Sequence, residues 1–322
     1  MMQTACLRKA VRGLFAAVLC CGALAGQASD VPYVPTPMNV VDAMLELGKV
    51  GPGDFLIDLG SGDGRISIRA AERFGTRGFG VDLDDKLVRM ALDGARRRGV
   101  QDKVTFEARN IFATDISRAT VVTAYLLNSV NLRLRPELFA QLKPGTRIVS
   151  HDFDFGNWEP DHRLSIAVPD KAYGPPRSDV MLWVVPADFS GKWAWRMPAD
   201  GAGHEYEVSL EQTFQKAKGL GRIAGQAAAA GNMEIHGDTI SFVMGAEIAG
   251  KATWREFRGR ISGDMITGSV VTIVDADVVH RTGQPVAWQA QRIQPGKMII
   301  SGMNINADAA LRIANSSFTW EQ

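Results

Sequence analysis

A glycine-rich run directly after a short apolar stretch is the part of this sequence best suited to bind a ligand. The segment 58–65 reads DLGSGDGR, begins with Asp58 and follows the apolar Phe55-Leu56-Ile57. Glycine lets the backbone turn sharply and approach a ligand where a Cβ would block it. In α/β sheets such a loop lies between a strand and a helix and binds a nucleotide. A dinucleotide fingerprint, G-x-G-x-x-G, would need its third glycine where this chain has Arg65, so the spacing favours another nucleotide-like ligand.

An acidic residue at the end of the next apolar stretch suits a ribose. Asp82 follows Gly78-Phe79-Gly80-Val81, at the interval of about 20 residues that doubly wound folds use for this purpose. A carboxylate accepts hydrogen bonds from two neighbouring hydroxyls, and each such bond contributes about 1.5–3 kcal/mol. We therefore expect Asp82 to bind a ribose. Asp84 and Asp85, in contrast, are typical N-cap residues for a helix that begins near Lys86.

Three further stretches, at 104–107, 119–125 and 147–150, have the composition of strands in the same sheet. The stretch 119–125 is almost continuously apolar, which is typical of a parallel strand covered on both faces. The carboxyl ends of parallel strands meet at one edge of a sheet, where α/β folds bind their ligands. Six side chains at or after the ends of these stretches are therefore expected near the ligand: Asn110, Tyr125, Asn128, Asn131, His151 and Asp152.

A short segment before the glycine loop leads into a predicted helix. Apolar residues recur at helical spacing from Val40 to Leu47. Thr36 is expected to cap this helix, with Pro37 at its first position. Tyr33 either closes over the ligand or packs against the fold.

The stretch from Tyr33 to about Pro186 resembles bacterial class I methyltransferases that depend on S-adenosylmethionine (SAM). These are akin to the mitochondrial ATP-synthase c-subunit lysine methyltransferases, and the non-SET histone lysine methyltransferases are more distantly similar. The resemblance rests on seven motifs: Tyr33-Val34-Pro35-Thr36-Pro37, Asp58 to Arg65, Gly80-Val81-Asp82, Tyr125-Leu126-Leu127, Leu134-Arg135-Pro136, Leu142 to Arg147 and Ser150-His151-Asp152-Phe153. It implies an α/β fold with a Rossmann-like seven-stranded sheet, SAM as the cofactor and transfer of its methyl group, with a protein lysine as one acceptor.

The resemblance and the loop chemistry together assign the cofactor site. The expected cofactor-binding residues are Tyr33, Asp58, Gly60, Ser61, Gly62, Asp63, Gly64, Asp82 and Asn110. Asn110 stands where the family usually has an acidic residue that meets the adenine amino group, and its amide still offers an acceptor. Asn128 stands where the family usually has proline, which leaves the acceptor open.

A lysine acceptor must be neutral to attack a methyl group. With a reference pKa near 10.4, only about one exposed lysine in 2,000 is neutral at pH 7. An apolar slot lowers that pKa. We expect Tyr125 to line the slot with its neighbours, Asn128 or Asn131 to orient the amine, and Asp152 or His151 to take the proton. The predicted catalytic residues are Tyr125, Asn128 and Asp152.

Residues 1–28 have the pattern of a signal peptide. Arg8, Lys9 and Arg12 precede an apolar stretch from Leu14 to Leu24, and small residues follow at Gly26-Gln27-Ala28. This predicts export by the Sec route to the periplasm or medium, with an uncleaved inner-membrane anchor as the alternative. All three cysteines lie in this segment. The mature chain therefore lacks disulfides, cysteine metal sites and a cysteine nucleophile.

Charge and histidine content narrow the range of partners. The net charge is +1, and loss of the three basic residues of the signal segment makes it −2, so no global field favours nucleic acid. The five histidines are scattered without a metal-ligand spacing, so no metal is expected. The sequence gives no indication of the oligomeric state. The expected partner is a methyl acceptor, with a membrane-associated protein as one candidate.

The second half of the chain has a different pattern. Short alternating stretches separated by glycine predict an all-β barrel or sandwich over 187–322, after a methyltransferase domain at 29–186. Its tryptophans either line a ligand cavity or form the core: Trp193, Trp195, Trp254, Trp288 and Trp320. The segment 227–230, four alanines, is expected to be a loop or a helical turn.

Export and SAM are in conflict, because SAM is made in the cytosol. Three hypotheses resolve this. The enzyme acts before export or while anchored, or SAM reaches the periplasm, or the chain is an exported non-catalytic binding protein whose β-barrel binds a ligand or partner. The joint presence of Asp58, the three glycines and Asp82 favours an enzyme over the third hypothesis.

Overall fold

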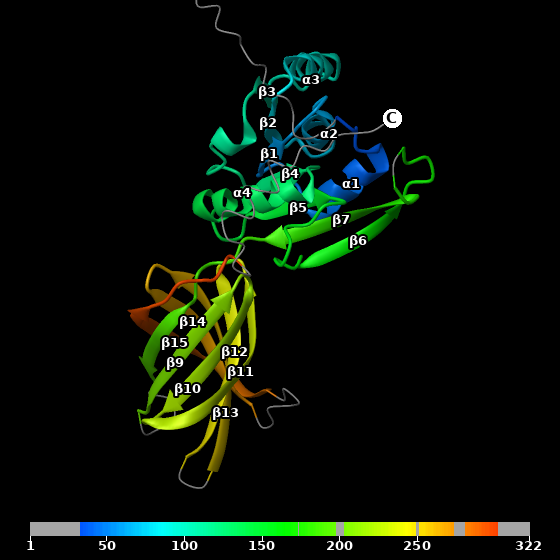
Figure 1. Cartoon of the computed structure of the whole chain (residues 1–322). Helices are drawn as coiled ribbons and strands as arrows, with labels where there is room; N and C mark the ends of the chain where they lie inside the picture. Colours follow the sequence, from blue (N-terminus) through cyan, green and yellow to red (C-terminus); the bar gives the residue numbers. More distant parts are fainter. Residues whose placement is uncertain (1–32, 173, 198–202, 249–250, 274–280, 302–322) are drawn as a thin grey trace, which may run out of the picture.

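The computed structural model describes residues 33–172, 174–197, 203–248, 251–273 and 281–301. They form a mixed α/β sheet with its helices and, below it in Figure 1, a β-barrel. The predicted signal peptide and Trp320 lie outside the described residues. Within the described ranges, no helix is long and apolar enough to cross a bilayer.

The first body is a seven-stranded sheet, as predicted. Its strand order is β3-β2-β1-β4-β5-β7-β6, parallel from β3 to β5 and with β7 antiparallel to its neighbours. The strands are β1 (Phe55–Leu59), β2 (Arg77–Asp82), β3 (Val104–Ala108), β4 (Val121–Ala124), β5 (Arg147–His151), β6 (His162–Ala167) and β7 (Arg177–Val184). All four residues of β4 are buried, in agreement with the apolar pattern of a covered parallel strand.

Four α-helices and one 3₁₀ turn cover this sheet: α1 (Met38–Leu47), α2 (Arg65–Phe74), α3 (Asp85–Arg97), η1 (Ile111–Ala113) and α4 (Asn128–Gln141). The carboxylate of Asp84 accepts the Lys86 N–H at 2.7 Å and caps α3, as predicted. The predicted cap of α1 is wrong. Pro37 occupies the N-cap position without a side-chain bond, because the Thr36 hydroxyl lies 3.3 Å from Nδ1 of His151 instead.

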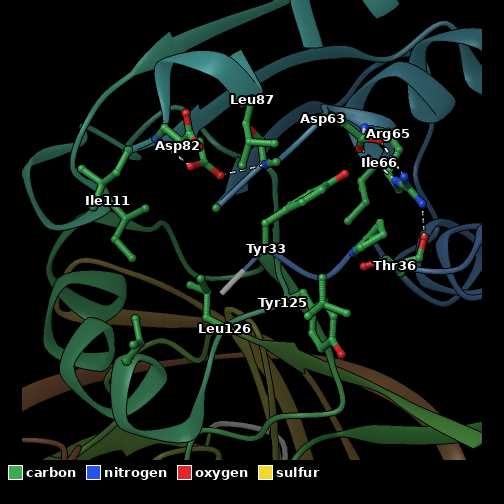
Figure 2. A pocket seen from close by; sticks show the side chains of 18 of the residues that line it. Tyr33, Thr36, Asp63, Arg65, Ile66, Asp82, Leu87, Ile111, Tyr125 and Leu126 are labelled. Atoms are coloured by element: carbon green, nitrogen blue, oxygen red, sulfur yellow. Dashed lines mark hydrogen bonds and ion pairs between the residues drawn. The ribbon is translucent and has the colours of Figure 1, made fainter. Parts of the chain in front are cut away.

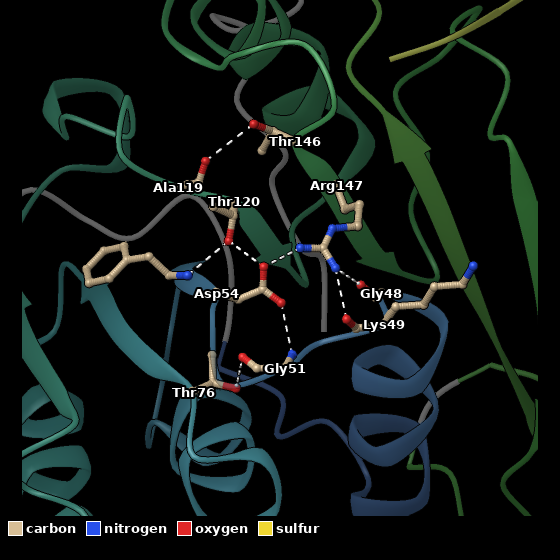
Figure 3. A network of polar contacts seen from close by, with 10 residues as sticks. Gly48, Lys49, Gly51, Asp54, Thr76, Ala119, Thr120, Thr146 and Arg147 are labelled. Atoms are coloured by element: carbon tan, nitrogen blue, oxygen red, sulfur yellow. Dashed lines mark hydrogen bonds and ion pairs between the residues drawn. The ribbon is translucent and has the colours of Figure 1, made fainter. Parts of the chain in front are cut away.

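A polar network joins the amino ends of the strands, at the edge of the sheet opposite the glycine loop (Figure 3). The Arg147 guanidinium donates to the carbonyls of Gly48 and Lys49 at 2.7 and 2.9 Å and pairs with Asp54. The Asp54 carboxylate also accepts the Thr120 hydroxyl at 2.7 Å and the N–H of Gly51 at 2.9 Å. The network therefore connects the end of α1 to β1, β4 and β5.

Removal of the Arg147 charge is expected to destabilise the fold. In Arg147→Met, the Asp54 carboxylate, only 13% exposed, loses its cation and two carbonyls lose their donor. We expect the free energy of unfolding to fall by about 2–3 kcal/mol, as measured by urea denaturation, with unchanged SAM affinity. The matched control is Arg163→Met, which breaks the exposed Arg163–Asp179 pair and should cost less than about 1 kcal/mol. Equal losses in the two variants would contradict this prediction.

The second body is a closed eight-stranded antiparallel barrel, which is the first of the two predicted alternatives. Its strands are β8 (Gly191–Arg196), β9 (Glu205–Thr213), β10 (Lys216–Ile223), β11 (Gln226–His236), β12 (Thr239–Ile248), β13 (Lys251–Ser262), β14 (Met265–Ile273) and β15 (Arg281–Pro295). The prediction of a loop or helical turn at 227–230 is wrong. These alanines lie in β11, where pairing with neighbouring strands overrides their weak β propensity.

Aromatic side chains fill the barrel interior. Five rings lie in mutual contact at centroid distances of 5.0 to 6.2 Å: Trp195, Tyr206, Phe242, Phe257 and Trp288. All five are buried, as is Trp193. Trp254 packs over Gly245, where a Cβ would lie 2.2 Å from the indole. The described tryptophans of the barrel are therefore packing residues, with no role shown in a ligand cavity.

One barrel residue completes the core of the sheet. Phe214, between β9 and β10, is 3% exposed and belongs to the core cluster of the sheet. Its ring centroid lies 5.8 Å from that of Trp158, in a stacked arrangement, and 5.9 Å from that of Phe139. The Arg135 guanidinium lies over the same ring at 5.3 Å. The barrel thus packs against α4 and the loop after β5.

Candidate functional site

A cavity of about 460 Å³ opens where β1, β2, β3 and β4 end (Figure 2). This volume suits a small organic ligand. Of the predicted cofactor residues, seven line the cavity: Tyr33, Gly60, Ser61, Gly62, Asp63, Asp82 and Asn110. Asp58 and Gly64 do not line it. The predicted catalytic residue Tyr125 lines it, whereas Asn128 and Asp152 do not.

The glycine loop has the backbone conformation that requires glycine. Gly60, Gly62 and Gly64 have φ angles of 76°, 53° and 77°, in the left-handed region that other residues rarely adopt. A Cβ on Gly62 would lie 2.7 Å from the Tyr33 ring. A Cβ on Gly64 would instead lie 2.6 Å from Phe106, so Gly64 allows the start of α2 to pack against β3. The first two glycines shape the cavity and the third shapes the fold beneath it.

The Asp82 carboxylate forms hydrogen bonds to the backbone of the glycine loop and of the next helix. One carboxylate oxygen accepts the N–H of Gly62 at 2.9 Å and the other accepts the N–H of Asp84 at 3.0 Å. Each oxygen keeps a further acceptor position, because a carboxylate offers about four. The side chain lines the cavity, so its geometry is compatible with the predicted pair of ribose hydroxyls.

Loss of the Asp82 carboxylate is expected to weaken SAM binding. Asp82→Ala removes charge-assisted bonds that contribute about 1.5–3 kcal/mol, which corresponds to about a 10- to 100-fold higher dissociation constant. Calorimetric titration of SAM into the folded variant measures this. Asp115→Ala is the matched control, because the exposed Asp115 carboxylate also accepts a backbone N–H two residues later, that of Ser117 at 2.9 Å, but does not line the cavity. It should leave SAM affinity unchanged. Normal SAM affinity of Asp82→Ala would place the ribose elsewhere.

An ion pair that the sequence analysis did not identify ties the Tyr33 segment to the loop. Arg65 forms two bonds to Asp63, at 2.9 and 2.6 Å, and donates to the Thr36 carbonyl at 2.9 Å. Figure 2 shows the Tyr33 ring pointing toward this pair. Burial raises the pKa of Tyr33, and the negative charge of Asp63 adds to the effect. Burial alone would raise the pKa of Asp63, but the hydrogen bonds and charge of Arg65 hold it below its ordinary value.

A buried carboxyl lies beneath the loop. Asp58 is 1% exposed. One of its oxygens accepts the Thr123 hydroxyl at 2.7 Å and the other has no hydrogen-bond partner among the described residues. Burial raises the Asp58 pKa to about 7, and the charges of Asp82 and Asp63 contribute to the shift. An approaching cation would therefore favour the ionised form of this group.

We expect SAM binding to depend on pH through Asp58. Because the pKa in the free protein is about 7, a cationic ligand binds more tightly as the pH rises from 5.5 to 8, and binding near pH 6.5 releases protons. Calorimetry in buffers of different ionisation enthalpy counts those protons, and Asp58→Asn should remove this release. Without ligand, a raised carboxyl pKa means that the folded state holds more protons, so stability falls as the pH rises from about 4 to 7. Identical proton counts in both proteins would contradict this assignment.

Asn110 has a different local role from the one predicted. Its amide oxygen accepts the Phe112 N–H at 2.9 Å and caps η1. The amide N–H₂ group does not take part in this hydrogen bond. Apolar side chains adjoin it in the cavity. Those that the sequence analysis missed are Leu83, Leu87, Ile111, Phe112 and Val130, together with Arg133, whereas Leu126 lines the cavity as predicted. Leu83, Leu87, Ile111 and Phe112 share one signal, a position soon after the carboxyl end of a strand, whereas Val130 and Arg133 lie in α4.

Tyr125, which lines the cavity, belongs to an aromatic stack. Tyr125 lies on the ring of His151 at a centroid distance of 3.8 Å, and Phe153 lies 5.9 Å from Tyr125. Burial raises the pKa of Tyr125, and the charge of Asp152 adds to the shift. The phenol therefore stays protonated at neutral pH.

The other predicted catalytic side chains have partners outside the cavity. Exposed Asn128 donates to Asp154 at 2.7 Å. The Asp152 carboxylate accepts Nζ of Lys171 at 2.6 Å and the Asp179 N–H at 2.9 Å. Direct catalytic roles for Asn128 and Asp152 therefore stay predictions that this geometry does not support. In the described ranges, no cluster of His, Cys, Asp and Glu could hold a metal ion.

The cavity fits SAM on three observations. The first two glycines lie so close to Leu126 and Tyr33 of the cavity lining that neither position has space for a Cβ. The buried Asp58 oxygen without a partner suits a positive charge nearby, and the Asp82 carboxylate suits a ribose. The residues that would hold SAM are the glycine loop, Asp82 and the side chains that flank Asn110.

Comparisons with known proteins agree with this assignment. Residues 58–162 match the ANTKMT methyltransferase domain. A protein-lysine N-methyltransferase of Saccharolobus islandicus is 47% identical over 137 residues, which are 42% of this chain and 85% of that protein. The ATP-synthase c-subunit lysine N-methyltransferase of Xenopus laevis is 32% identical over 132 residues, or 41% of this chain and 58% of that protein.

Two further matches concern a mouse protein and a solved structure. The adenine nucleotide translocase lysine N-methyltransferase of Mus musculus is 35% identical over 132 residues, 41% of this chain and 57% of that protein. The chain thus spans just over half the length of the Xenopus and mouse relatives. A crystal structure of an RNA methyltransferase from Salinibacter ruber with S-adenosyl-L-homocysteine is 51% identical, covers 48% of this chain and 96% of that one, and has a TM-score of 0.44.

Proposed function

We propose that this chain, which belongs to the ANTKMT methyltransferase family, transfers the methyl group of SAM to a lysine amine of a protein. The observation that carries the proposal is the apolar wall of Tyr125, Leu126 and Val130, which lines the same cavity as the glycine loop. The Saccharolobus relative, a protein-lysine methyltransferase at 47% identity, supports the same acceptor. We assign this activity to residues 29–186, with 187–322 as a separate barrel domain.

The chain's own residues have three tasks in this reaction. SAM, when bound, supplies a methyl group on a positively charged sulfur. The glycine loop and Asp82 fix the donor, so that the acceptor meets the methyl group in line. The wall of Tyr125, Leu126 and Val130 disfavours a charged amine, lowers its pKa and so raises the neutral fraction. A nitrogen–carbon bond forms as the sulfur–carbon bond breaks, and the proton of the product amine passes to water.

The acceptor can be identified by labelling. The purified protein is incubated with SAM carrying a tritiated methyl group and with lysates of cells that lack the gene, separated into membrane and soluble fractions. We expect label in protein, on lysine side chains by mass spectrometry, and enriched in the membrane fraction. Tyr125→Ala, which removes the aromatic wall, should bind SAM and lose most of the transfer. Label in nucleic acid, or on another side chain, would overturn the lysine assignment.

We also propose that the chain acts at or beyond the inner membrane, on a membrane-associated acceptor. The basic and apolar pattern of residues 1–28 supports this location. Cell fractionation with an antibody against the barrel tests it. Recovery in the periplasm or inner membrane is expected. A soluble cytosolic chain that still begins at Met1 would overturn it, whereas a chain wholly outside the inner membrane would require SAM in that compartment.

A further inference from the structure

A buried histidine behind the aromatic wall touches both sides of the cavity without lining it. His151, the last residue of β5, is 0% exposed. Its Nδ1 lies 3.3 Å from the Thr36 hydroxyl and its Nε2 lies 2.8 Å from the Ser178 hydroxyl of β7. Its ring stacks on Tyr125 at 3.8 Å. The segment before α1, the end of β4 and the antiparallel strand β7 therefore meet at one imidazole.

The His151 imidazole is uncharged at neutral pH, so it does not hold an exchangeable extra proton there. Burial lowers the pKa of His151 to about 4, against the opposing effect of Asp152 and with a further lowering by Lys171. At neutral pH the ring is uncharged, so one nitrogen donates a hydrogen bond and the other accepts one. The Asp152 carboxylate also lies 3.3 Å from Nε2 and can only accept, which favours the proton on Nε2. Nδ1 is then the acceptor for the Thr36 hydroxyl.

We propose that His151 is a positioning residue that fixes the two walls of the methyl-transfer cavity relative to each other. Through Thr36 it holds the segment that carries Tyr33 over the glycine loop. Through its ring it holds Tyr125, which lines the cavity, in a stacked position. The inference depends on the SAM site and is independent of which acceptor the enzyme uses.

The geometry explains why one residue type serves both contacts. Thr36 is 4% exposed and lines the cavity, and its carbonyl is already held by Arg65. The hydroxyl bond to His151 is a second attachment of the same residue, on the Tyr125 side. A phenylalanine would stack without the bond, and an asparagine would place an amide near Nδ1 without the stack. Histidine supplies a flat ring and a ring nitrogen that can accept the Thr36 hydroxyl.

Three substitutions separate the two contacts. Thr36→Val removes the hydrogen bond and keeps the stack. His151→Asn retains a hydrogen-bonding group near Thr36 and removes the stack. His151→Phe restores the ring to Tyr125. Ser178→Ala is the matched control, because it removes a contact of the same imidazole that reaches neither cavity wall.

Two measurements on the full chain report on the two walls. SAM affinity is measured by calorimetric titration. The Tyr125 environment is followed by ¹⁹F NMR after 3-fluorotyrosine labelling, since the chain has four tyrosines and Tyr125→Phe assigns the signal. Loss of one hydrogen bond of about 1 kcal/mol corresponds to about a fivefold change in affinity.

We expect a distinct pattern for each variant. Thr36→Val lowers SAM affinity about fivefold and leaves the Tyr125 signal a single sharp line. His151→Asn shifts or broadens that line, and His151→Phe restores a single sharp line. Ser178→Ala changes stability alone. The proposal is overturned if SAM affinity and the Tyr125 signal change equally in all four variants. It is also overturned if neither changes in Thr36→Val and His151→Asn. Normal SAM binding by the parent protein with no transfer to any lysine would instead count against the proposed function alone.

Discussion

Valine in place of Gly62 is expected to weaken SAM binding by at least about 100-fold in a protein that still folds. Gly62 has a φ of 53°, and a residue other than glycine costs about 1–2 kcal/mol in that region, more for a β-branched side chain. The new Cβ would also lie 2.7 Å from the Tyr33 ring, which must move. Both effects act on the loop that we expect to contact the cofactor, and a loss of about 2.8 kcal/mol is a factor of 100.

A control at Gly99 distinguishes the effect of a collision with Tyr33 from the effect of backbone strain. Gly99 has a φ of 68°, similar to that of Gly62, and a Cβ added there would meet nothing within 4 Å. Gly99→Val should therefore lower the thermal unfolding midpoint through strain and leave SAM affinity unchanged. Calorimetric titration and thermal unfolding of both variants measure the two effects. If Gly62→Val binds SAM like the parent, the Tyr33 side of the cavity does not take part in cofactor binding.

Local sequence patterns predicted the sheet and the cavity edge well, because both follow from short-range rules. A glycine loop after an apolar strand, and an acid about 20 residues later, place Gly62 and Asp82 at one edge of a parallel sheet. The structure shows these two residues joined by a hydrogen bond of 2.9 Å. The same rules count residues along the chain and do not show which side chains face the cavity. Asp58 and Gly64 belong to the same motif, yet neither lines the cavity.

Contacts between distant segments were beyond these rules. Thr36 has the residue type and place of an N-cap, but a partner 115 residues later takes its hydroxyl. Asp152 follows a strand at the correct edge, but Lys171 from the β6–β7 connection pairs with its carboxylate. Both residues were assigned from local position alone, and tertiary hydrogen bonds determine where their side chains point.

Truncation of Phe214 is expected to have the largest effect on stability, because this barrel residue completes the core of the sheet. The side chain is 3% exposed and stacks on Trp158. Loss of a buried phenylalanine side chain costs about 3–5 kcal/mol, since the neighbours relax only partly into the cavity. Arg135 would also lose the ring that lies 5.3 Å from its guanidinium. We expect Phe214→Ala to lower the urea midpoint of unfolding, followed by tryptophan fluorescence.

A matched control in the same β9–β10 hairpin tests whether the loss of stability comes from the packing of Phe214 or from any change in the hairpin. Leu220 lies in β10, the strand after Phe214, and is 80% exposed, so Leu220→Ala should change stability by less than about 0.5 kcal/mol. In Phe214→Ala the sheet and the barrel should unfold in two transitions, because their shared core is lost. SAM affinity at low temperature should fall less in Phe214→Ala than in Gly62→Val. A single transition at the parent midpoint would mean that the barrel contributes nothing to the stability of the methyltransferase fold. The predicted result would instead make the barrel a structural part of an enzyme whose Saccharolobus relative matches only 42% of this chain.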